Sequence, residues 1–102
     1  SITSRVNIEK DRIIFLTKEL QSIQKTAKFI LDFDYEKSSV AEFLEIILSG
    51  ALANKASDIH FEPEEGFIKL RYRIDGILQD VATEIQRNFY PSVISRIKLL
   101  RP

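Results

Sequence analysis

Six charged or ionisable side chains alternate with apolar residues in two neighbouring stretches of the chain. The members are Asp58, His60 and Glu62 in the first stretch and Lys69, Arg71 and Arg73 in the second. Alternate residues of a β-strand point to the same side of the sheet. Each stretch therefore predicts a strand with one charged face, the first mostly acidic and the second basic.

The acidic stretch holds residue types that bind metal ions or transfer protons. Neighbouring same-face positions on a strand lie about 6.6 Å apart, so Asp58, His60 and Glu62 do not converge on one ion and we expect no metal site. His60 is the only histidine, and Asp58 is close enough to orient it. A hydrolase that uses Asp58 and His60 stays open as an alternative, although no serine shares their face to act as the nucleophile.

The basic stretch has the side chains that bind phosphate groups of nucleotides or nucleic acids. Tyr72, which lies between Arg71 and Arg73, points to the opposite side and offers no stacking platform for bases. We therefore expect no nucleic-acid partner. Ion pairing within the sheet, or contact with another protein, is the favoured interpretation of the basic residues.

Both stretches belong to a predicted antiparallel meander of three strands. The strands are expected at 58–62, 68–74 and 77–82. Asp75-Gly76 is typical of the two-residue hairpin turn that needs a positive φ at both positions. This turn sets the register of the last two strands, and it places Arg71 opposite Asp80 and Arg73 opposite Leu78.

One face of this meander is predicted to be covered and the other to carry the charges. A three-stranded sheet needs a layer of helices on one face to be stable. The side chains expected on the covered face are Ile59, Phe61, Ile68, Leu70, Tyr72 and Ile74. Leu78 falls on the charged face, and an apolar residue beside ordered basic residues suggests that this face meets a partner.

Three helices are expected around the sheet, at 6–31, 40–54 and 90–100. The first has apolar residues at a period of 3.5, namely Ile13, Leu16, Leu20, Ile23, Ala27 and Ile30. Packing on its own domain is the favoured interpretation, with a coiled coil or a linker helix docked on a neighbour as alternatives. The second begins with a capping-box pattern, Ser39 followed by Glu42 three residues later, and must be buried along one side.

The overall composition favours a folded domain with no strong electrostatic preference. The 102 residues include 15 Lys and Arg against 15 Asp and Glu, and 44% are hydrophobic. With no cysteine, disulfides and thiolate sites are excluded, and no apolar run approaches the roughly 18 residues of a membrane span. The absence of methionine leads us to expect an interior fragment or a processed chain.

The strand sequences resemble a hallmark of the secretion ATPase superfamily, the hexameric motors of type II secretion and of type IV pilus assembly and retraction. The resemblance lies in Ala56-Ser57-Asp58-Ile59-His60-Phe61-Glu62-Pro63 and in Leu70-Arg71-Tyr72-Arg73-Ile74-Asp75-Gly76-Ile77-Leu78. It covers residues 40–100. The family pattern reads roughly S-D-I-H-I-E-P, a short loop, and then R-x-R-x-D-G-x-L.

The resemblance implies a non-catalytic domain that precedes the motor core and has a PAS-like α+β fold. The motor core of the family carries a phosphate loop, whereas this chain has only Gly50, Gly66 and Gly76 and no Gly-Lys pair. We therefore expect no enzyme activity and no cofactor in this chain, with ATP and magnesium bound by the parent protein. Implied partners are neighbouring subunits of a homo-hexamer and inner-membrane secretion or pilus platform proteins, in the cytoplasm at the periphery of the inner membrane.

These observations together give a two-part organisation and a candidate interface. Residues 1–37 are predicted to form an amphipathic helix and linker, and residues 38–102 a PAS-like accessory domain that lacks its last strands. The expected interface comprises Asp58, His60, Lys69, Arg71, Arg73 and Leu78. It would mediate subunit contacts and couple ATP hydrolysis in the motor core to motion. A stand-alone PAS-like sensor or interaction module, with a ligand pocket inside the sheet, is the main alternative.

Overall fold

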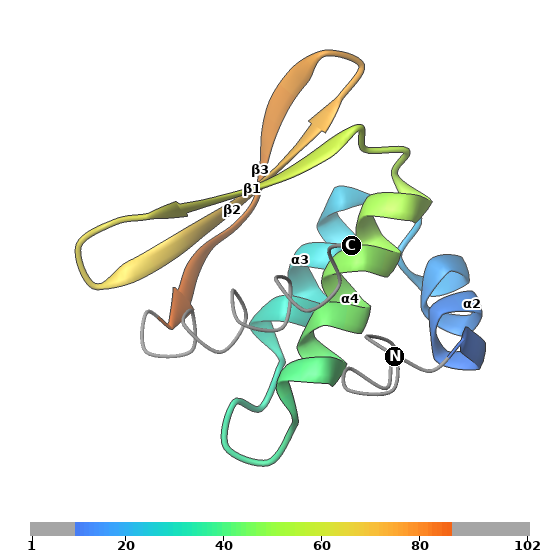
Figure 1. The fold of residues 1–102 in the computed structure, drawn as a ribbon, viewed down its shortest axis with the longest axis horizontal. Coiled ribbons are helices and arrows are strands. Elements are labelled where there is room, and N and C mark those ends of the chain that lie inside the picture. The colour runs from blue at the N-terminus through green and yellow to red at the C-terminus, as the bar shows by residue number, and fades with distance from the viewer. Residues whose placement is uncertain (1–9, 87–102) are drawn as a thin grey trace, which may run out of the picture.

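The computed structural model describes residues 10–86, except for the side chains of residues 83 and 84. Of the three helices in this part of the chain, the second and third lie against one face of a three-stranded antiparallel sheet, and the first packs on the third (Figure 1). The predicted α+β class and the meander are confirmed. The helix expected at 90–100 lies outside the described residues, and a PAS-like topology stays a prediction.

The first expected helix is wrong as a single element, because the chain breaks it into two. Helix α2 spans Lys10–Glu19 and helix α3 spans Ile23–Leu31. Ser22 has an extended backbone between them, and its side-chain oxygen accepts a 3.1 Å hydrogen bond from the backbone N–H of Lys25. A serine in this position caps a new helix, so the chain can change direction while its apolar residues stay on the core side.

Asn54, which directly follows the third helix (α4, Val40–Ala53), holds the break between α2 and α3 in place. Its side-chain amide donates to the carbonyl oxygens of Leu20, at 3.0 Å, and Gly50, at 2.8 Å. Thr26 is fully buried, and its hydroxyl donates to the carbonyl oxygen of Ser22 at 3.0 Å. The backbone groups that the break leaves unpaired are thereby satisfied inside the protein, as buried polar groups require.

Helix α4 spans Val40–Ala53 and begins at the predicted capping box. The Ser39 hydroxyl accepts from the N–H of Glu42 at 3.1 Å, and the Glu42 carboxylate accepts from the N–H of Ser39 at 3.2 Å. Beyond the end of the helix, Lys55 adopts a positive φ of 58°. The N–H of Lys55 bonds to Leu52 and that of Ala56 to Ala51, which is the pattern of a Schellman cap.

Helix α4 is buried on more than the one side that its apolar stripe predicted. Phe43, Leu44 and Ile47 face the sheet as expected, but Glu45 and Ile46 are also buried, because α2 covers that side of α4. The Glu45 carboxylate forms a 3.0 Å ion pair with Arg12 of α2. Leu52 lies on the predicted stripe but is 63% exposed.

The sheet comprises β1 (Asp58–Pro63), β2 (Phe67–Ile74) and β3 (Ile77–Gln86), in that order. Asp75 and Gly76 have φ values of 53° and 80°, as the predicted turn requires. The register pairs Arg71 with Asp80 and Arg73 with Leu78, so the predicted pairing is confirmed.

Strand β3 is four residues longer than expected, and its register with β2 shifts twice along its length. Arg71 pairs with Asp80 but Leu70 pairs with Ala82, so Val81 is an extra residue on β3. Such a bulge changes which side chains face the core. A second shift follows, because Ile68 pairs with Ile85, so the two shifts together leave Val81 and Ile85 on the same side of the strand, where both are buried.

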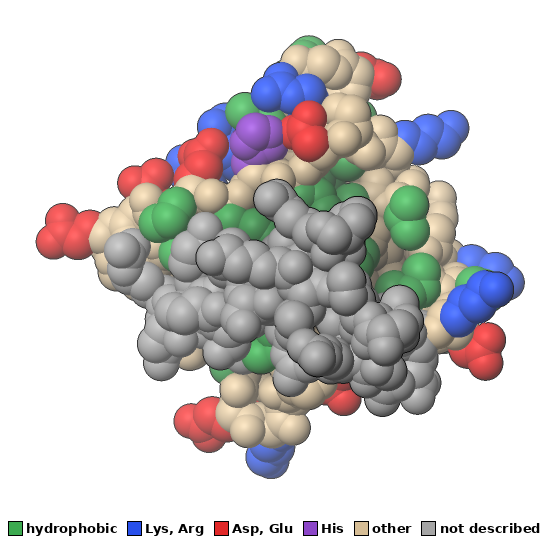
Figure 2. Space-filling model, viewed as in Figure 1, with side chains coloured by type: hydrophobic (Ala, Val, Ile, Leu, Met, Phe, Trp, Pro, Cys, Tyr) green, Lys and Arg blue, Asp and Glu red, His purple; other side chains and the backbone are tan. Residues whose placement is uncertain are grey.

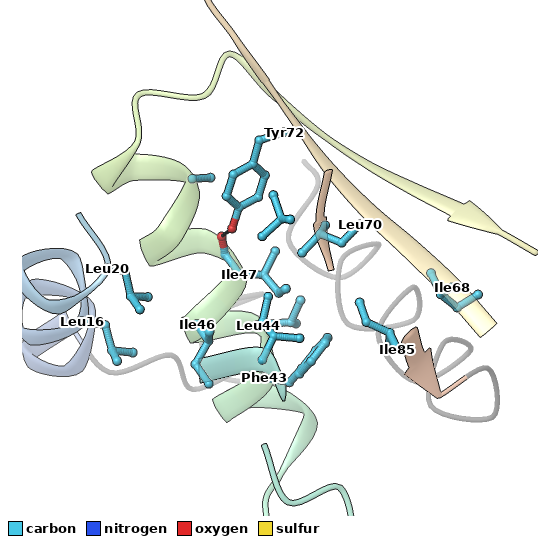
Figure 3. Packing of buried hydrophobic residues seen from close by; sticks show 13 residues of the cluster. Leu16, Leu20, Phe43, Leu44, Ile46, Ile47, Ile68, Leu70, Tyr72 and Ile85 are labelled. Carbon is cyan, nitrogen blue, oxygen red and sulfur yellow. Dashed lines mark hydrogen bonds between the residues drawn. The ribbon is translucent and has the colours of Figure 1, made fainter. Parts of the chain in front are cut away.

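The core lies between α4 and the inner side of the sheet (Figure 3). Ile68, Leu70 and Tyr72 of β2 are fully buried, and Ile59, Phe61 and Ile74 pack partly against them, as predicted. Leu16 of α2, Leu20 just after α2 and Ile30 of α3 belong to the same cluster. These helices therefore pack on their own domain, which was the favoured interpretation, whereas a division of the chain after residue 37 stays a prediction.

No helix within residues 10–86 is long and apolar enough to cross a membrane.

Candidate functional site

The side of the sheet away from the helices carries the charged residues that the alternation predicted. We call this surface the outer sheet face. Its members are Asp58, His60 and Glu62 of β1, Phe67, Lys69, Arg71 and Arg73 of β2, and Leu78 and Asp80 of β3. Figure 2 shows acidic, basic and histidine side chains gathered together over the strands.

Arg71 joins the three strands at the centre of this face. Its Nη1 donates a 3.2 Å hydrogen bond to Glu62 Oε1 on β1, and its Nε lies 2.9 Å from Asp80 Oδ1 on β3. The Nε–H is not directed at that oxygen, so the contact with Asp80 is an ion pair without a hydrogen bond. The hydrogen bond to Glu62 raises the pKa of Arg71, which keeps the guanidinium charged.

Arg73, Asp58 and His60 form a second cluster on the same face. Arg73 Nε donates to Asp58 Oδ2 at 3.2 Å, and Arg73 Nη1 donates to the carbonyl oxygen of Gly76 in the hairpin turn at 3.1 Å. His60 Nε2 lies 2.5 Å from the other carboxylate oxygen, Asp58 Oδ1. The side chain of Arg73 is thus fixed at both ends of its guanidinium.

Lys69 and two apolar residues complete the outer sheet face. No ion pair to Lys69 is found among the described residues, because the acid opposite it, Glu62, bonds to Arg71 instead. Leu78 is half-buried opposite Arg73. Phe67 also lies on this face and outside the core cluster, but the sequence did not lead us to predict it. Phe67 is two residues before Lys69, so the alternation along the strand could have placed both on the same face.

The face is electrically balanced, and two of its arginines are held in place by carboxylates. Three cations (Lys69, Arg71 and Arg73) stand against three acids (Asp58, Glu62 and Asp80). Arginines that are held in a defined geometry lose less conformational freedom on binding than mobile ones. Such a surface suits contact with a protein better than capture of a free ion.

The geometry gives little support to catalysis by Asp58 and His60. In a Ser-His-Asp triad the imidazole stands between the hydroxyl and the carboxylate. Here the Asp58 carboxylate stands in the middle, 3.4 Å from the Ser57 hydroxyl and 2.5 Å from His60. Among the described residues, no three His, Cys, Asp or Glu side chains are grouped so that they can hold a metal ion.

A sensor domain would need a ligand pocket between the sheet and its helices, and within residues 10–86 this space is occupied by side chains. The space between β2 and α4 is filled by Phe43, Leu44, Ile47 and Tyr72 (Figure 3). An apolar hollow of about 470 Å³ does exist, but it opens at the surface beside the end of α4 and the start of β1. Leu48, Leu52 and Ile59 are among its lining residues.

Comparison with known proteins assigns the class of protein. The model of the type II/IV secretion system protein family matches residues 34–102, so the chain belongs to this family. The match includes α4, the hairpin and every residue of the outer sheet face. Helices α2 and α3 precede it.

Individual relatives come from both secretion and pilus systems. The chain is 35% identical over 71 residues to type II secretion system protein E of Pectobacterium carotovorum subsp. carotovorum. It is 31% identical over 90 residues to the type IV pilus assembly ATPase PilB of Myxococcus xanthus, and 38% identical over 61 residues to type II secretion system protein HxcR of Pseudomonas aeruginosa.

These matches cover most of the chain but a small part of each relative. They take in 70%, 88% and 60% of this chain, in the order given above, against 14%, 15% and 13% of the relatives. The chain thus corresponds to about one seventh of a secretion or pilus protein. No solved structure matches it.

Proposed function

We propose that this chain is a non-catalytic accessory domain of a secretion or pilus-assembly ATPase, and that its outer sheet face contacts a neighbouring subunit. The observation that carries the proposal is the pre-arranged state of this face. Arg71 and Arg73 are each held by carboxylates from other strands, with Leu78 opposite Arg73. Interfaces favour arginine beside apolar groups, and ordered side chains lower the entropic cost of binding.

The proposal also assigns a mechanical role to the domain. Movement of a neighbouring subunit against the outer sheet face would pass through β2 to α4, because Tyr72 on the inner side of β2 is bonded to Ile47 of α4. The sheet and helix would then move as one body. In this way the domain would couple ATP hydrolysis in the motor core to motion.

The remaining features of the proposal follow from the family. ATP and magnesium would bind to the motor core of the longer protein, not to this chain, whose sequence has no Gly-Lys pair for a phosphate loop. The partners would be the other subunits of a homo-hexamer, with inner-membrane platform proteins contacted by the whole assembly. The site of action would be the cytoplasmic side of the inner membrane.

The test is to change Arg73 to alanine in the full-length ATPase and to measure hexamer assembly and ATP hydrolysis. We expect reduced assembly or a slower rate, while the isolated domain keeps its circular dichroism spectrum and melting temperature within a few degrees. Lys37→Ala is the matched control, because Lys37 is an exposed cation outside this face. Wild-type assembly and activity in Arg73→Ala would contradict the proposal.

A further inference from the structure

Helix α2 is apolar on two opposite sides. Leu16 is buried against the core, and Ile13 on the same side is partly buried. Ile14 and Phe15 point away from that side and are 50% and 56% exposed. A helix packed on one surface needs only one apolar side, so the pair at 14 and 15 is not explained by folding of the described chain.

The second apolar side has a defined charge at each end. Asp11, Ile14, Phe15 and Lys18 follow the spacing i, i+3, i+4 and i+7, which puts them in one stripe along the helix. Asp11 and Lys18 are exposed, and no ion pair within residues 10–86 involves either of them. The helix dipole favours an acid near the start and a base near the end, but it does not account for the exposed Ile14 and Phe15.

This stripe is complementary to itself when a second copy is turned end to end. A two-fold axis that passes between Ile14 and Phe15 puts Ile14 of one copy opposite Phe15 of the other. The same operation puts Asp11 opposite Lys18 at both ends, because the two charges are equally distant in sequence from the axis. Such an isologous arrangement is the commonest basis of homodimers.

We propose that the outer side of α2 is a self-association site at which two copies of this chain pair antiparallel. One helix stripe buries less area than the 1,200–2,000 Å² that is roughly typical of stable complexes, so the dimer is weak and depends on concentration. It becomes effective where copies are already held close together. The site is separate from the outer sheet face, since α2 lies on the side of α4 away from the hairpin (Figure 1).

Sedimentation equilibrium of the 102-residue chain, from micromolar to millimolar concentration, tests the proposal. We expect a reversible monomer–dimer equilibrium that weakens with added salt, because exposed charge pairs are screened. Asp11→Lys alone and Lys18→Asp alone each put like charges opposite one another at both ends, so each should raise the dissociation constant several-fold. The double variant exchanges the charges and should restore the wild-type constant.

The apolar pair is tested with a matched control. Phe15→Asp should raise the dissociation constant by at least about tenfold, since it puts a charge in the centre of the contact. Leu31→Asp makes the same kind of change at an apolar residue that is 77% exposed on α3, and it should leave the equilibrium unchanged. Circular dichroism of each variant confirms that the helices are intact.

Two results would overturn the proposal. One is a chain that stays monomeric at every concentration, which would also be the outcome if another segment of the chain covered the stripe. The other is a dimer that Phe15→Asp leaves intact, or that the double charge exchange fails to restore. Neither result bears on Arg73 and the outer sheet face, so this test and that of the proposed function fail independently.

Discussion

The hydroxyl of Tyr72, on the middle strand, donates a 2.6 Å hydrogen bond to the carbonyl oxygen of Ile47 in α4, and both residues are buried. Figure 3 shows Tyr72 reaching from the sheet toward the helix. Its neighbours in sequence, Arg71 and Arg73, project from the other side of the same strand. The bond therefore ties the strand that carries the candidate interface to the main helix of the domain.

Tyr72→Phe removes this bond and should lower the free energy of unfolding by about 1 kcal/mol, the typical net contribution of a hydrogen bond. Urea denaturation followed by circular dichroism measures the change. A free energy of unfolding that stays unchanged in Tyr72→Phe would contradict a stabilising role for this bond.

The same tyrosine should make the protein less stable in alkali. Burial raises the pKa of Tyr72 above its ordinary value, because the charged phenolate is disfavoured away from water. The folded state then holds a proton that the unfolded state releases above pH of about 10. Stability from this residue is complete below that pH and is lost as the pH rises toward the folded pKa, by up to about 1.4 kcal/mol per pH unit.

Unfolding free energies between pH 8 and pH 12, roughly the range that spans tyrosine ionisation, check this expectation. Tyr72→Phe should start from a lower stability at pH 8 and should decline less steeply above pH 10. Parallel curves for the wild type and the variant would show that Tyr72 does not titrate with unfolding.

Gly50→Ala should destabilise the protein although alanine favours helices. A Cβ atom at this position would lie 2.6 Å from Thr26 Cγ2 and 2.7 Å from Tyr72 Oη. Overpacking of this kind costs about 1–3 kcal/mol, against about 1 kcal/mol gained in helix propensity. In thermal melts, Gly50→Ala should cost less in a Tyr72→Phe background, where the crowded oxygen is absent. Strict additivity of the two changes would contradict this packing.

Lys55→Gly should raise the free energy of unfolding by about 0.5–1 kcal/mol. Lys55 adopts a positive φ of 58° in the cap of α4, a conformation that costs energy for a residue with a Cβ atom. Lys55→Val is the opposite control and should lose stability, since a β-branched residue is poorly tolerated there. Urea denaturation of both variants measures the two changes. A loss of stability in Lys55→Gly would mean that the lysine side chain makes a contribution larger than the backbone strain.

Local patterns in the sequence predicted most of the sheet and the start of α4. The alternation of charged and apolar residues identified both faces of β1 and β2, and Asp75-Gly76 set the pairing of Arg71 with Asp80. These features depend only on residues close together in the chain. The members of the outer sheet face could be predicted for the same reason, although which carboxylate each arginine selects could not.

The features that the sequence did not reveal depend on distant contacts or on a single residue. The break at Ser22 lies in a stretch whose apolar period continues without interruption, so the stretch reads as one helix. Glu45 is buried beneath α2, where Arg12, 33 residues away in the sequence, pairs with its carboxylate. The register of β3 shifts on both sides of the pair formed by Leu70 and Ala82, and no local signal marks either shift.

The central claim, that the outer sheet face meets a neighbouring subunit, is tested most directly by photo-crosslinking in the full-length ATPase. A benzophenone amino acid replaces Leu78, and in a second protein it replaces Lys37 as the control. On illumination we predict crosslinked subunit pairs from position 78 and none from position 37. Crosslinks from position 78 that stay within one subunit, or that are as rare as those of the control, would contradict the claim.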